Sequence, residues 1–355
     1  MSFYILAIDP GSTSTKAALY KDERPLFELT INHTAEELEC YEHVVDQAEW
    51  RQDLVIYRLN EEGFSIEDLS AVVGRGGIVK PIEGGVYSIN DTLWHDTKHA
   101  DLEHACNLGA LIARTIADQV GVPSFIADPV VMDEMEPLAR ITGLPQCPRR
   151  SLFHALNTRA IARLHARNQG KRIEDMNLIV AHLGGGVTVS LHSKGQVIDT
   201  TCGLGGDGTF SPERAGRLPS NLLIDMCFSG KYTHREMHKF ITGLGGFVAH
   251  LGTNSIIEVL EMAGEGSKKA EQILDAFCYN IAKDIGAMST VVYGEVDGII
   301  LTGAIAHSQY ITERVLARCQ SIAPVVVYPG ENELESLAMN ALSVLRGETV
   351  AKEYV

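Results

Sequence analysis

The feature that most constrains the fold is a strand–turn–strand pattern that occurs twice, once in each half of the chain. The first copy spans residues 4–20, where two apolar runs flank the turn Gly11-Ser-Thr-Ser14. The second spans residues 178–191, where two apolar runs flank the turn Gly184-Gly-Gly186. Each pattern predicts an antiparallel hairpin, and their spacing indicates a duplicated domain.

Both turns have the chemistry of a phosphate-binding site. Backbone N–H groups and hydroxyls suit phosphate oxygens, and Asp9 before the first turn offers an oxygen ligand for a hydrated Mg²⁺. Three consecutive glycines are costly in chain entropy, so their presence favours close approach of a ligand. An ordinary Ser/Thr-rich hairpin is the other interpretation of the first segment, and the second copy favours phosphate binding.

Length and charge indicate two domains and restrict the partners. A chain of 355 residues is too long for one compact core, and 45% hydrophobic residues suffice for two. Because Pro145 and Pro148 interrupt the pattern, we expect one domain at residues 1–148, joined by the C-terminal helix 332–355, and the other at 149–331. The formal charge of −16 argues against a nucleic-acid partner.

Cysteine usage and hydropathy predict a reduced, cytoplasmic protein. The seven cysteines are scattered and form no CxxC motif, which argues against a disulfide framework and a zinc site. No apolar run is long enough for a membrane span, and the sequence shows no signal peptide.

Alternating strand and helix patterns predict an α/β fold with helices on both faces of the sheets. A formal GxGxxG at residues 203–208 is not a dinucleotide fingerprint, because two prolines follow and no helix begins at the third glycine. The chain also has no GxxxxGK[ST] motif, which excludes a P-loop. The expected helices are 47–62, 101–119, 151–168, 268–292, 309–320 and 332–346, and the expected further strands are 69–73, 123–127, 196–199, 296–301 and 324–328.

Residues at strand ends and in glycine-bounded loops are candidate ligand-binding groups. Arg75 ends an apolar strand between glycines, where a guanidinium can bind a carboxylate or phosphate bidentately. A surface arginine is the alternative, but the glycines suggest close approach to a ligand. Asp128 ends a strand in the same way, with an Asp-Pro turn equally favoured. For Arg214 a functional loop and a solvated charged loop are evenly balanced.

Three further residues are interpreted first as structural. His154 fits a histidine on a helix face. His104 and Asn107 stand three apart on the expected helix 101–119, which favours a core histidine capped by asparagine.

The strand–Gly303–helix unit is similar to a nucleotide-binding turn in which a helix N-terminus points at the ligand.

In their order along the chain, these segments resemble those of the acetate and butyrate kinases, within the larger fold of sugar kinases, actin and the Hsp70 ATPase domain. The short Arg-Gly-Gly form, the Pro-Glu-Arg-Ala-Gly loop and the length are more similar to the butyrate kinases. Position 9 carries Asp where the family usually has Asn. The segments that carry the resemblance are 9–16, 74–77, 104–109, 153–154, 181–186, 212–216 and 329–333.

The resemblance implies two duplicated ribonuclease H-like domains that face one another across a nucleotide cleft, in an actin-like ATPase fold. It also implies reversible in-line phosphoryl transfer from ATP to a short-chain fatty acid, giving acyl phosphate and ADP with Mg²⁺, by a homodimer or higher homo-oligomer. Arg75 would hold the carboxylate, and Arg214 with His154 would contact the transferring group. Asp128 would orient an arginine or a Mg²⁺-bound water.

The resemblance also implies ligand sets, which cover both halves of the chain. Arg75, His104 and Asn107 are the expected substrate-binding residues. Asp9 is the expected metal ligand together with Glu331 or Glu333, since the acidic segment aligns in two registers. The expected nucleotide-binding residues are Gly11, Ser12, Thr13, Ser14, Lys16, His182, Gly184, Gly185, Gly186, Gly303 and Ala304.

Two other functions fit the same fold. One is a kinase that acts on an alcohol and uses Asp128 as a base, and the other is a non-catalytic nucleotide-binding module. Neither requires two arginines that bind a carboxylate or phosphate. The acyl chain length stays open, because each methylene is worth only about 1–3 kcal/mol in an apolar pocket.

Overall fold

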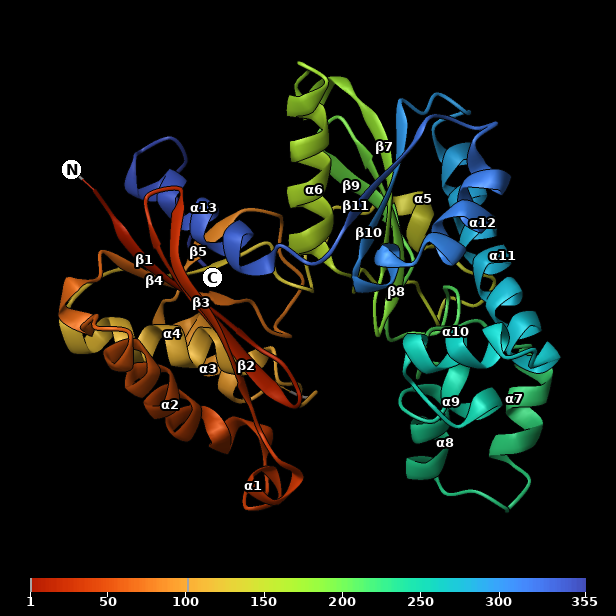
Figure 1. The fold of residues 1–355 in the computed structure, drawn as a ribbon, viewed down its shortest axis with the longest axis horizontal. Coiled ribbons are helices and arrows are strands. Elements are labelled where there is room, and N and C mark those ends of the chain that lie inside the picture. Colours follow the sequence, from red (N-terminus) through yellow and green to blue (C-terminus); the bar gives the residue numbers. More distant parts are fainter. Residues whose placement is uncertain (1, 101) are drawn as a thin grey trace. The chain divides into compact units, whose positions relative to one another are not determined.

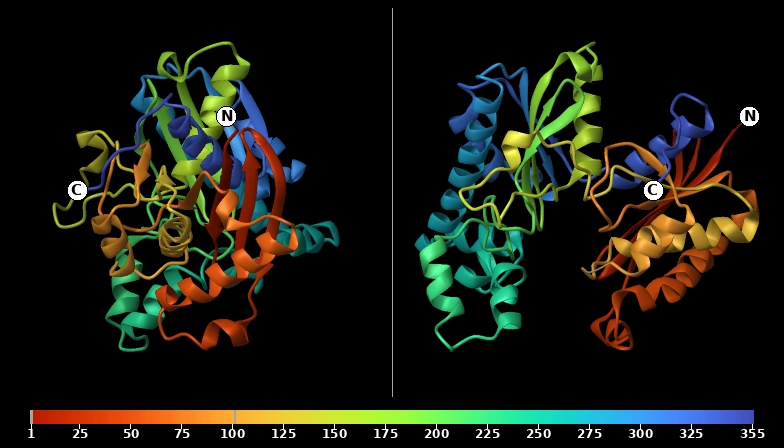
Figure 2. Two further views of the ribbon diagram at one scale, coloured as in Figure 1. Left: turned by 90° about the vertical axis from the view of Figure 1, so that its left-hand side faces the viewer. Right: turned by 180° about the vertical axis from the view of Figure 1, so that it is seen from behind.

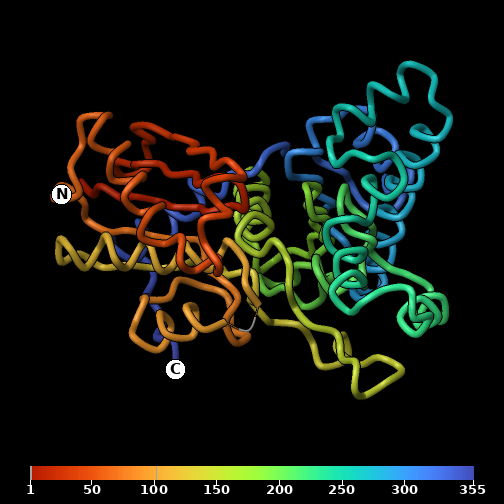
Figure 3. Tube along the Cα trace, turned by 90° about the horizontal axis from the view of Figure 1, so that it is seen from below, coloured from red at the N-terminus to blue at the C-terminus, as the bar shows by residue number. Residues whose placement is uncertain are grey.

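The computed structural model describes residues 2–100 and 102–355, and it divides the chain into two compact units. Unit 1 comprises Met1–Met132 and Asn332–Val355, and unit 2 comprises Asp133–Glu331. Figure 3 follows the C-terminal segment, in blue, as it leaves unit 2 and returns to unit 1. Asp101, the first residue of one expected helix, lies outside the described residues.

Unit 1 contains a six-stranded mixed sheet in the order β3-β2-β1-β4-β6-β5. The first three strands form an antiparallel meander, and β4 and β6 continue the sheet parallel to β1. The C-terminal tail joins its edge, since Lys352 exchanges backbone hydrogen bonds with Val86 and Ser88. The strands are β1 (Tyr4–Pro10), β2 (Ser14–Lys21), β3 (Arg24–Asn32), β4 (Ala71–Arg75), β5 (Val86–Ser88) and β6 (Ser124–Ala127).

Helices cover both faces of the unit 1 sheet (Figure 1). Helix α13 packs on one face and α4 on the other, with α2 and α3 against α4. The α4 stripe of Leu108, Ile112 and Ile116, at intervals of four residues, is fully buried in the core. These helices are α1 (Ala35–Glu39), α2 (Ala48–Glu61), α3 (Asp91–Lys98), α4 (Asn107–Val120) and α13 (Glu333–Leu345).

Unit 2 repeats this topology in a five-stranded sheet of order β11-β10-β7-β8-β9. The meander β7-β8-β9 is antiparallel, and β10 and β11 run parallel to β7. The order matches β6-β4-β1-β2-β3 of unit 1, which confirms the duplication that the two hairpins predict. The strands are β7 (Asn177–Leu183), β8 (Val187–Ser193), β9 (Gln196–Thr200), β10 (Gly298–Gly303) and β11 (Val325–Pro329).

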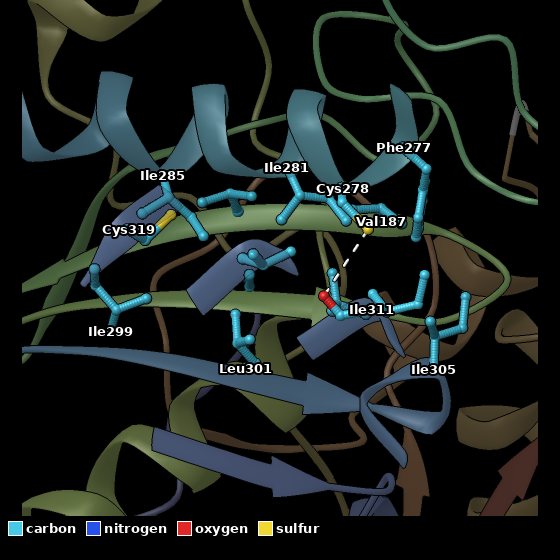
Figure 4. Packing of buried hydrophobic residues seen from close by; sticks show 14 of the residues in the cluster. Val187, Phe277, Cys278, Ile281, Ile285, Ile299, Leu301, Ile305, Ile311 and Cys319 are labelled. Atoms are coloured by element: carbon cyan, nitrogen blue, oxygen red, sulfur yellow. Dashed lines mark hydrogen bonds between the residues drawn. The ribbon is translucent and has the colours of Figure 1, made fainter. Parts of the chain in front are cut away.

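The unit 2 sheet lies between α6 on one face and α11 with α12 on the other (Figure 2). Figure 4 shows the larger core, where Ile281 and Ile285 of α11 lie over Ile299 and Leu301 of β10. The unit's helices are α5 (Pro137–Arg140), α6 (Ala155–Asn168), α7 (Ser220–Cys227), α8 (His234–Ile241), α9 (Gly246–Leu251), α10 (Ile256–Gly264), α11 (Lys268–Val291) and α12 (Gln309–Cys319).

The two units divide at Met132, earlier than the expected boundary at residue 148. The segment after Met132 belongs to unit 2 because it bonds the edge strand β9. Glu134 accepts a hydrogen bond from the backbone N–H of Val197 at 2.8 Å, and the N–H of Glu136 donates to the carbonyl of Ile198.

Among the helices of the described residues, none is long and apolar enough to cross a membrane.

Candidate active site

The carboxyl ends of β1, β4 and β6 bring three expected site residues to one edge of the unit 1 sheet. Because β4 pairs in parallel with both neighbours, Asp9, Arg75 and Asp128 follow one another along this edge. In open α/β sheets, ligands bind beyond the carboxyl ends of the strands. The first residue of α13, Glu333, reaches the same place from a distant part of the sequence.

Arg75 is held by two buried carboxylates. Its Nη1 donates to Asp9 Oδ1 at 3.0 Å and to Glu333 Oε2 at 2.8 Å, and each acid is only 5% exposed. Burial opposes the charge of Arg75, but Glu333 and Asp9 raise its pKa above the ordinary value. Burial likewise opposes ionisation of Asp9, yet Arg75 and a hydrogen bond from Glu333 hold its pKa below the usual range.

The other edge of the Arg75 guanidinium, formed by Nε and Nη2, contacts neither of these acids. All of its hydrogen bonds to described residues leave from Nη1, and the buried Nε–H has no acceptor within residues 2–100 and 102–355. The Nε and Nη2 groups of an arginine form a planar fork that matches a carboxylate. The two acids thus fix the Nη1 corner of the guanidinium, and neither of them contacts this fork.

The glycines around Arg75 serve packing, which corrects the reason expected from the sequence. A Cβ on Gly74 would lie 2.0 Å from the carbonyl oxygen of Gly109 in α4, and one on Gly76 would lie 2.5 Å from Pro129 Cβ. A Cβ on Gly77 would lie 2.4 Å from Asn107 Oδ1. The close approach that these glycines allow is therefore to the protein itself.

Asp128 occupies a strained and enclosed position. Its φ is 38°, which is uncommon for a residue other than glycine, and it is 2% exposed. Its Oδ1 accepts from the N–H of Gly85 at 2.8 Å, and its own N–H donates to the Gly85 carbonyl at 3.0 Å. Left-handed backbone at such a residue costs about 1–3 kcal/mol and often marks a functional position.

His104 and Asn107 do not share a helix face, because α4 begins only at Asn107. His104 lies in the preceding turn, where its Nδ1 accepts from the backbone N–H of Cys106 at 3.2 Å. Asn107 is buried, accepts from the N–H of Ile78 at 2.7 Å and donates to the carbonyl of Leu102 at 3.2 Å. Its amide thus ties the loop after Arg75 to the start of α4.

The first turn lies at the same end of β1 as Asp9. Ser12 and Thr13 are exposed, and the N–H of Gly11 donates to the Ser14 carbonyl at 2.7 Å. A Cβ on Gly11 would meet nothing closer than 3.5 Å, so packing within the protein does not require glycine there. Lys16 stands opposite Asp9 in the hairpin register.

Sequence reasoning missed Arg51, which lies under this turn. Its Nη1 donates to the Gly11 carbonyl at 2.8 Å, although the side chain belongs to α2. The available signal was its spacing, because Arg51, Val55 and Leu59 recur every four residues on one helix face, and all three are buried. A charged residue on a core-facing stripe indicates a buried polar role.

The Asp9 and Glu333 carboxylates fit a Mg²⁺ ion. Both contact one nitrogen of Arg75, so their oxygens lie close together at the sheet edge. Mg²⁺ in proteins is commonly held by one or two carboxylates together with water and substrate phosphates. Across residues 2–100 and 102–355, no group of three or more His, Cys, Asp or Glu side chains has the arrangement of a complete metal site. The donor set therefore suits an ion that arrives with phosphate.

In unit 2, the second turn carries two stacked histidines at its base. The rings of His154 and His182 lie 3.8 Å apart and nearly parallel, at 12°. His154 precedes α6, and its Nδ1 lies 2.9 Å from the hydroxyl of Thr188 on β8. His182 is the next-to-last residue of β7, and its Nδ1 donates to Asn157 Oδ1 at 2.8 Å. Thr188 and Asn157, both buried, are supporting residues that sequence reasoning did not identify.

Arg214 approaches the glycine turn of unit 2. Its Nη1 donates to the Gly203 carbonyl at 3.0 Å, and a Cβ on Gly186 would lie 2.1 Å from that same nitrogen. No carboxylate of the described chain forms an ion pair with Arg214, and burial lowers its pKa. The Gly185 carbonyl accepts from the hydroxyl of Ser211 at 2.7 Å, which fastens the arginine loop to the turn.

Glu331 and Glu333 face different partners. Glu331 belongs to unit 2, where its Oε1 lies 3.5 Å from Nε2 of His182. Glu333 belongs to unit 1 and contacts Arg75 beside Asp9. The geometry therefore places Glu333, two positions later in the chain, next to Asp9.

Gly303 has a packing role that its sequence context did not reveal. It adopts a φ of 90°, and a Cβ there would lie 2.4 Å from the Leu183 carbonyl oxygen. Ala304 begins a single 3₁₀ turn, Ala304–His307, and α12 starts only at Gln309. The expected helix 309–320 is thus confirmed as α12, and the 3₁₀ turn separates it from Gly303.

Comparison with known proteins shows similarity over the full chain. The acetokinase family model matches residues 146–337. A protein of Bacteroides thetaiotaomicron named probable butyrate kinase is 51% identical over 351 residues, covering 99% of each chain. Butyrate kinase 2 of Clostridium acetobutylicum is 47% identical over 355 residues, covering 100% of each.

Solved structures share the fold at lower identity. The acetate kinase of Porphyromonas gingivalis matches with a TM-score of 0.80 and 17% identity, over 97% of this chain and 100% of that one. A propionate kinase of Francisella tularensis matches with a TM-score of 0.72 and 18% identity, over 95% and 98%. With a full-length identity near one half to curated relatives, the chain belongs to the acetokinase family.

Proposed function

We propose that this protein is a phosphotransferase of the butyrate kinase type. It transfers the terminal phosphoryl group of ATP reversibly to the carboxylate of a short-chain fatty acid. The bond between the γ-phosphorus and the β–γ bridging oxygen breaks, a bond from a carboxylate oxygen to phosphorus forms, and acyl phosphate and ADP result. The observation that carries this proposal is the 47–51% identity, over nearly the whole length, to proteins named butyrate kinase.

In unit 1, we assign the substrate carboxylate to the Nε–Nη2 fork of Arg75. Asp9 and Glu333 bind Nη1 and would keep the fork in a fixed orientation as the acid arrives. Such preorganisation avoids reorganisation during the reaction. A carboxylic acid is already ionised at neutral pH, so the acceptor needs no general base. His104 and Asn107 would line the binding site of the acid, and Asp128 would orient an arginine or a Mg²⁺-bound water.

In unit 2, we assign the transferring phosphoryl group to Arg214 and His154. Phosphoryl transfer depends chiefly on positioning and on positive charge around the equatorial oxygens. A half-buried guanidinium without a carboxylate partner within the described residues supplies that charge in an environment with little screening. Thr188 would fix the ring of His154 as a hydrogen-bond donor.

The nucleotide phosphates would bind at the two turns, Gly11–Ser14 with Lys16 and Gly184–Gly186 with His182. Gly303 and Ala304 would contribute on the nucleoside side. Asp9 and Glu333 would hold Mg²⁺, which, when bound, neutralises phosphate charge. Glu331, the other expected candidate for the metal, contacts His182 within unit 2.

An acceptor panel tests the proposal. ATP and Mg²⁺ are incubated with acids of two to six carbons, and acyl phosphate is trapped as hydroxamate. Arg214→Ala should lower kcat roughly 100- to 1,000-fold, as expected when one preorganised donor is lost. The exposed Arg235→Ala is the matched control and should retain activity. Arg75→Lys keeps the charge beside its two acids but removes the fork, so it should raise KM for the acid.

Three results would contradict the proposal. Transfer to glycerol or a sugar, but to none of the acids, would indicate an alcohol kinase. Tight ATP binding without transfer to any acceptor would indicate a nucleotide-binding module. Near-normal activity of Arg214→Ala would refute the assignment of that residue.

The homodimer and the cytoplasmic location stay predictions. Light scattering after size-exclusion chromatography measures the oligomeric state.

A further inference from the structure

A buried arginine that the proposed reaction does not use lies directly behind the first phosphate turn. Arg51 is 1% exposed and extends from α2 to the turn between β1 and β2. Its Nη1 donates to the carbonyls of Gly11 at 2.8 Å and Ser14 at 3.2 Å, and its Nη2 donates to that of Ser12 at 3.4 Å. One side chain thus binds three of the four carbonyls of the turn.

The fourth carbonyl is also engaged by the protein. Thr13 accepts from the backbone N–H of His33 at 2.9 Å. In a trans peptide, the C=O and the following N–H point in opposite directions, and the described chain has no cis peptide bond. With the carbonyls of Gly11 and Ser12 turned toward Arg51, the N–H groups of Ser12 and Thr13 point away from it.

Successive N–H groups that point the same way form an anion-binding concavity. Ser12 and Thr13 are exposed, so their N–H groups lie where a ligand can reach them. The orientation of these groups depends on what holds the carbonyls on the other side. In this turn that contact is the Arg51 guanidinium.

The charge of Arg51 is not neutralised by an acid. Its other acceptors are neutral, namely Gln47 Oε1 at 2.7 Å from Nη2 and Thr15 Oγ1 at 3.1 Å from Nη1. Within residues 2–100 and 102–355, no carboxylate lies within ion-pair distance of Arg51. Burial lowers its pKa to about 10, so the side chain is still cationic at neutral pH. A buried cation held only by neutral dipoles is costly, which indicates a role beyond packing.

We propose that Arg51 is a positioning residue that orients the Ser12 and Thr13 amides toward the nucleotide phosphates and adds a positive field behind them. This inference rests on the proposed function, in which the turn binds ATP. It goes further, because it makes a residue that touches no substrate responsible for phosphate affinity. The guanidinium acts through the backbone of Gly11–Ser14.

Two substitutions at Arg51 and one control separate positioning from general stability. Arg51→Gln keeps polar donors but removes the charge and the fork, and Arg51→Lys keeps the charge alone. Arg58→Gln is the control, since Arg58 lies on the same helix but is exposed and pairs with Glu61 at 3.3 Å. Titration calorimetry measures the Kd of ATP and of adenosine for each folded variant, and rates give KM for ATP and for butyrate.

We expect Arg51→Gln to weaken ATP binding and raise KM for ATP roughly 10- to 100-fold, the range for losing hydrogen bonds to a charged group. Adenosine lacks the phosphates, so its Kd should stay within about twofold, as should KM for butyrate. For Arg51→Lys, the Kd and KM for ATP should fall between the values of Arg51→Gln and those of the wild type. For Arg58→Gln, both constants should match the wild-type values.

An unchanged Kd for ATP in Arg51→Gln would overturn the inference, and so would an equal loss for ATP and adenosine, which indicates a structural role. If Arg51→Gln does not fold, the same comparison of the Kd values for ATP and adenosine is made with Arg51→Lys. An Arg51→Lys protein that binds ATP as tightly as the wild type would then overturn the role of the fork. Failure of the wild type to phosphorylate any acid would refute the proposed function instead, while the ATP–adenosine comparison would still test Arg51.

Discussion

Replacing Gly186 with alanine tests whether the position of Arg214 controls phosphoryl transfer. The added Cβ would lie 2.1 Å from Arg214 Nη1 and 3.2 Å from Cε1 of His154, whereas ordinary contact begins at 3.4 Å. The clash is with the end of a flexible side chain, so the fold should persist while the guanidinium retreats by more than an ångström. Displacement of a reacting or stabilising group by about 1 Å costs roughly 100-fold in rate. We therefore expect kcat to fall roughly 100-fold.

The assay is the initial rate of acyl hydroxamate formation at saturating ATP and butyrate, with the thermal unfolding midpoint measured on the same samples. Gly264→Ala is the matched control, because this exposed glycine has an ordinary φ and its Cβ would have no neighbour within 4 Å. It should keep the wild-type rate. A Gly186→Ala enzyme within about threefold of the wild-type kcat, or an equal loss in Gly264→Ala, would refute the reasoning.

Two further predictions concern the metal and acid stability. Glu333→Gln should raise the Mg²⁺ concentration for half-maximal rate at least about tenfold, while Glu331→Gln should stay within about threefold, because Glu333 lies beside Asp9 within unit 1, whereas Glu331 contacts His182 within unit 2. A magnesium titration with the reverse order would assign the ion to Glu331. Burial and nearby arginines lower the pKa of His192 to about 3, so the unfolded chain takes up its proton first as pH falls below about 6.5, and stability declines. At about pH 4.5, His192→Gln should therefore retain roughly 2–3 kcal/mol more of its neutral-pH stability than the wild type in urea unfolding, and parallel pH profiles would contradict this.

The elements that the sequence predicts well are those whose signal is local. The hairpins 4–20 and 178–191 were predictable because an apolar run, a glycine turn and a second apolar run fix a strand pair without distant contacts. The expected helix 268–292 is α11, Lys268–Val291, whose buried stripe has helical spacing along its whole length. The start of α4 was placed too early, since residues before Asn107 are positioned by loop contacts rather than by periodicity.

The parts of the site that could not be predicted depend on register between distant segments. Glu333 meets Arg75 because α13 returns to the edge of a sheet formed more than 200 residues earlier, a contact with no local signal. The glycines after β4 were assigned to a ligand, although they allow α4 and Pro129 to approach. A glycine alone indicates close approach, and only the fold identifies what approaches.

The two units share one topology but place positive charge at their turns in opposite ways. In unit 1, Arg51 lies behind the turn and binds its carbonyls, so the exposed side can carry the hydroxyls of Ser12 and Thr13. In unit 2, Arg214 lies against the turn itself, and Gly186 must lack a side chain to admit it. A chain with a net charge of −16 must concentrate cations wherever an anion is to bind. The need for glycine at position 186 thus follows from the side of the backbone that the Arg214 guanidinium occupies.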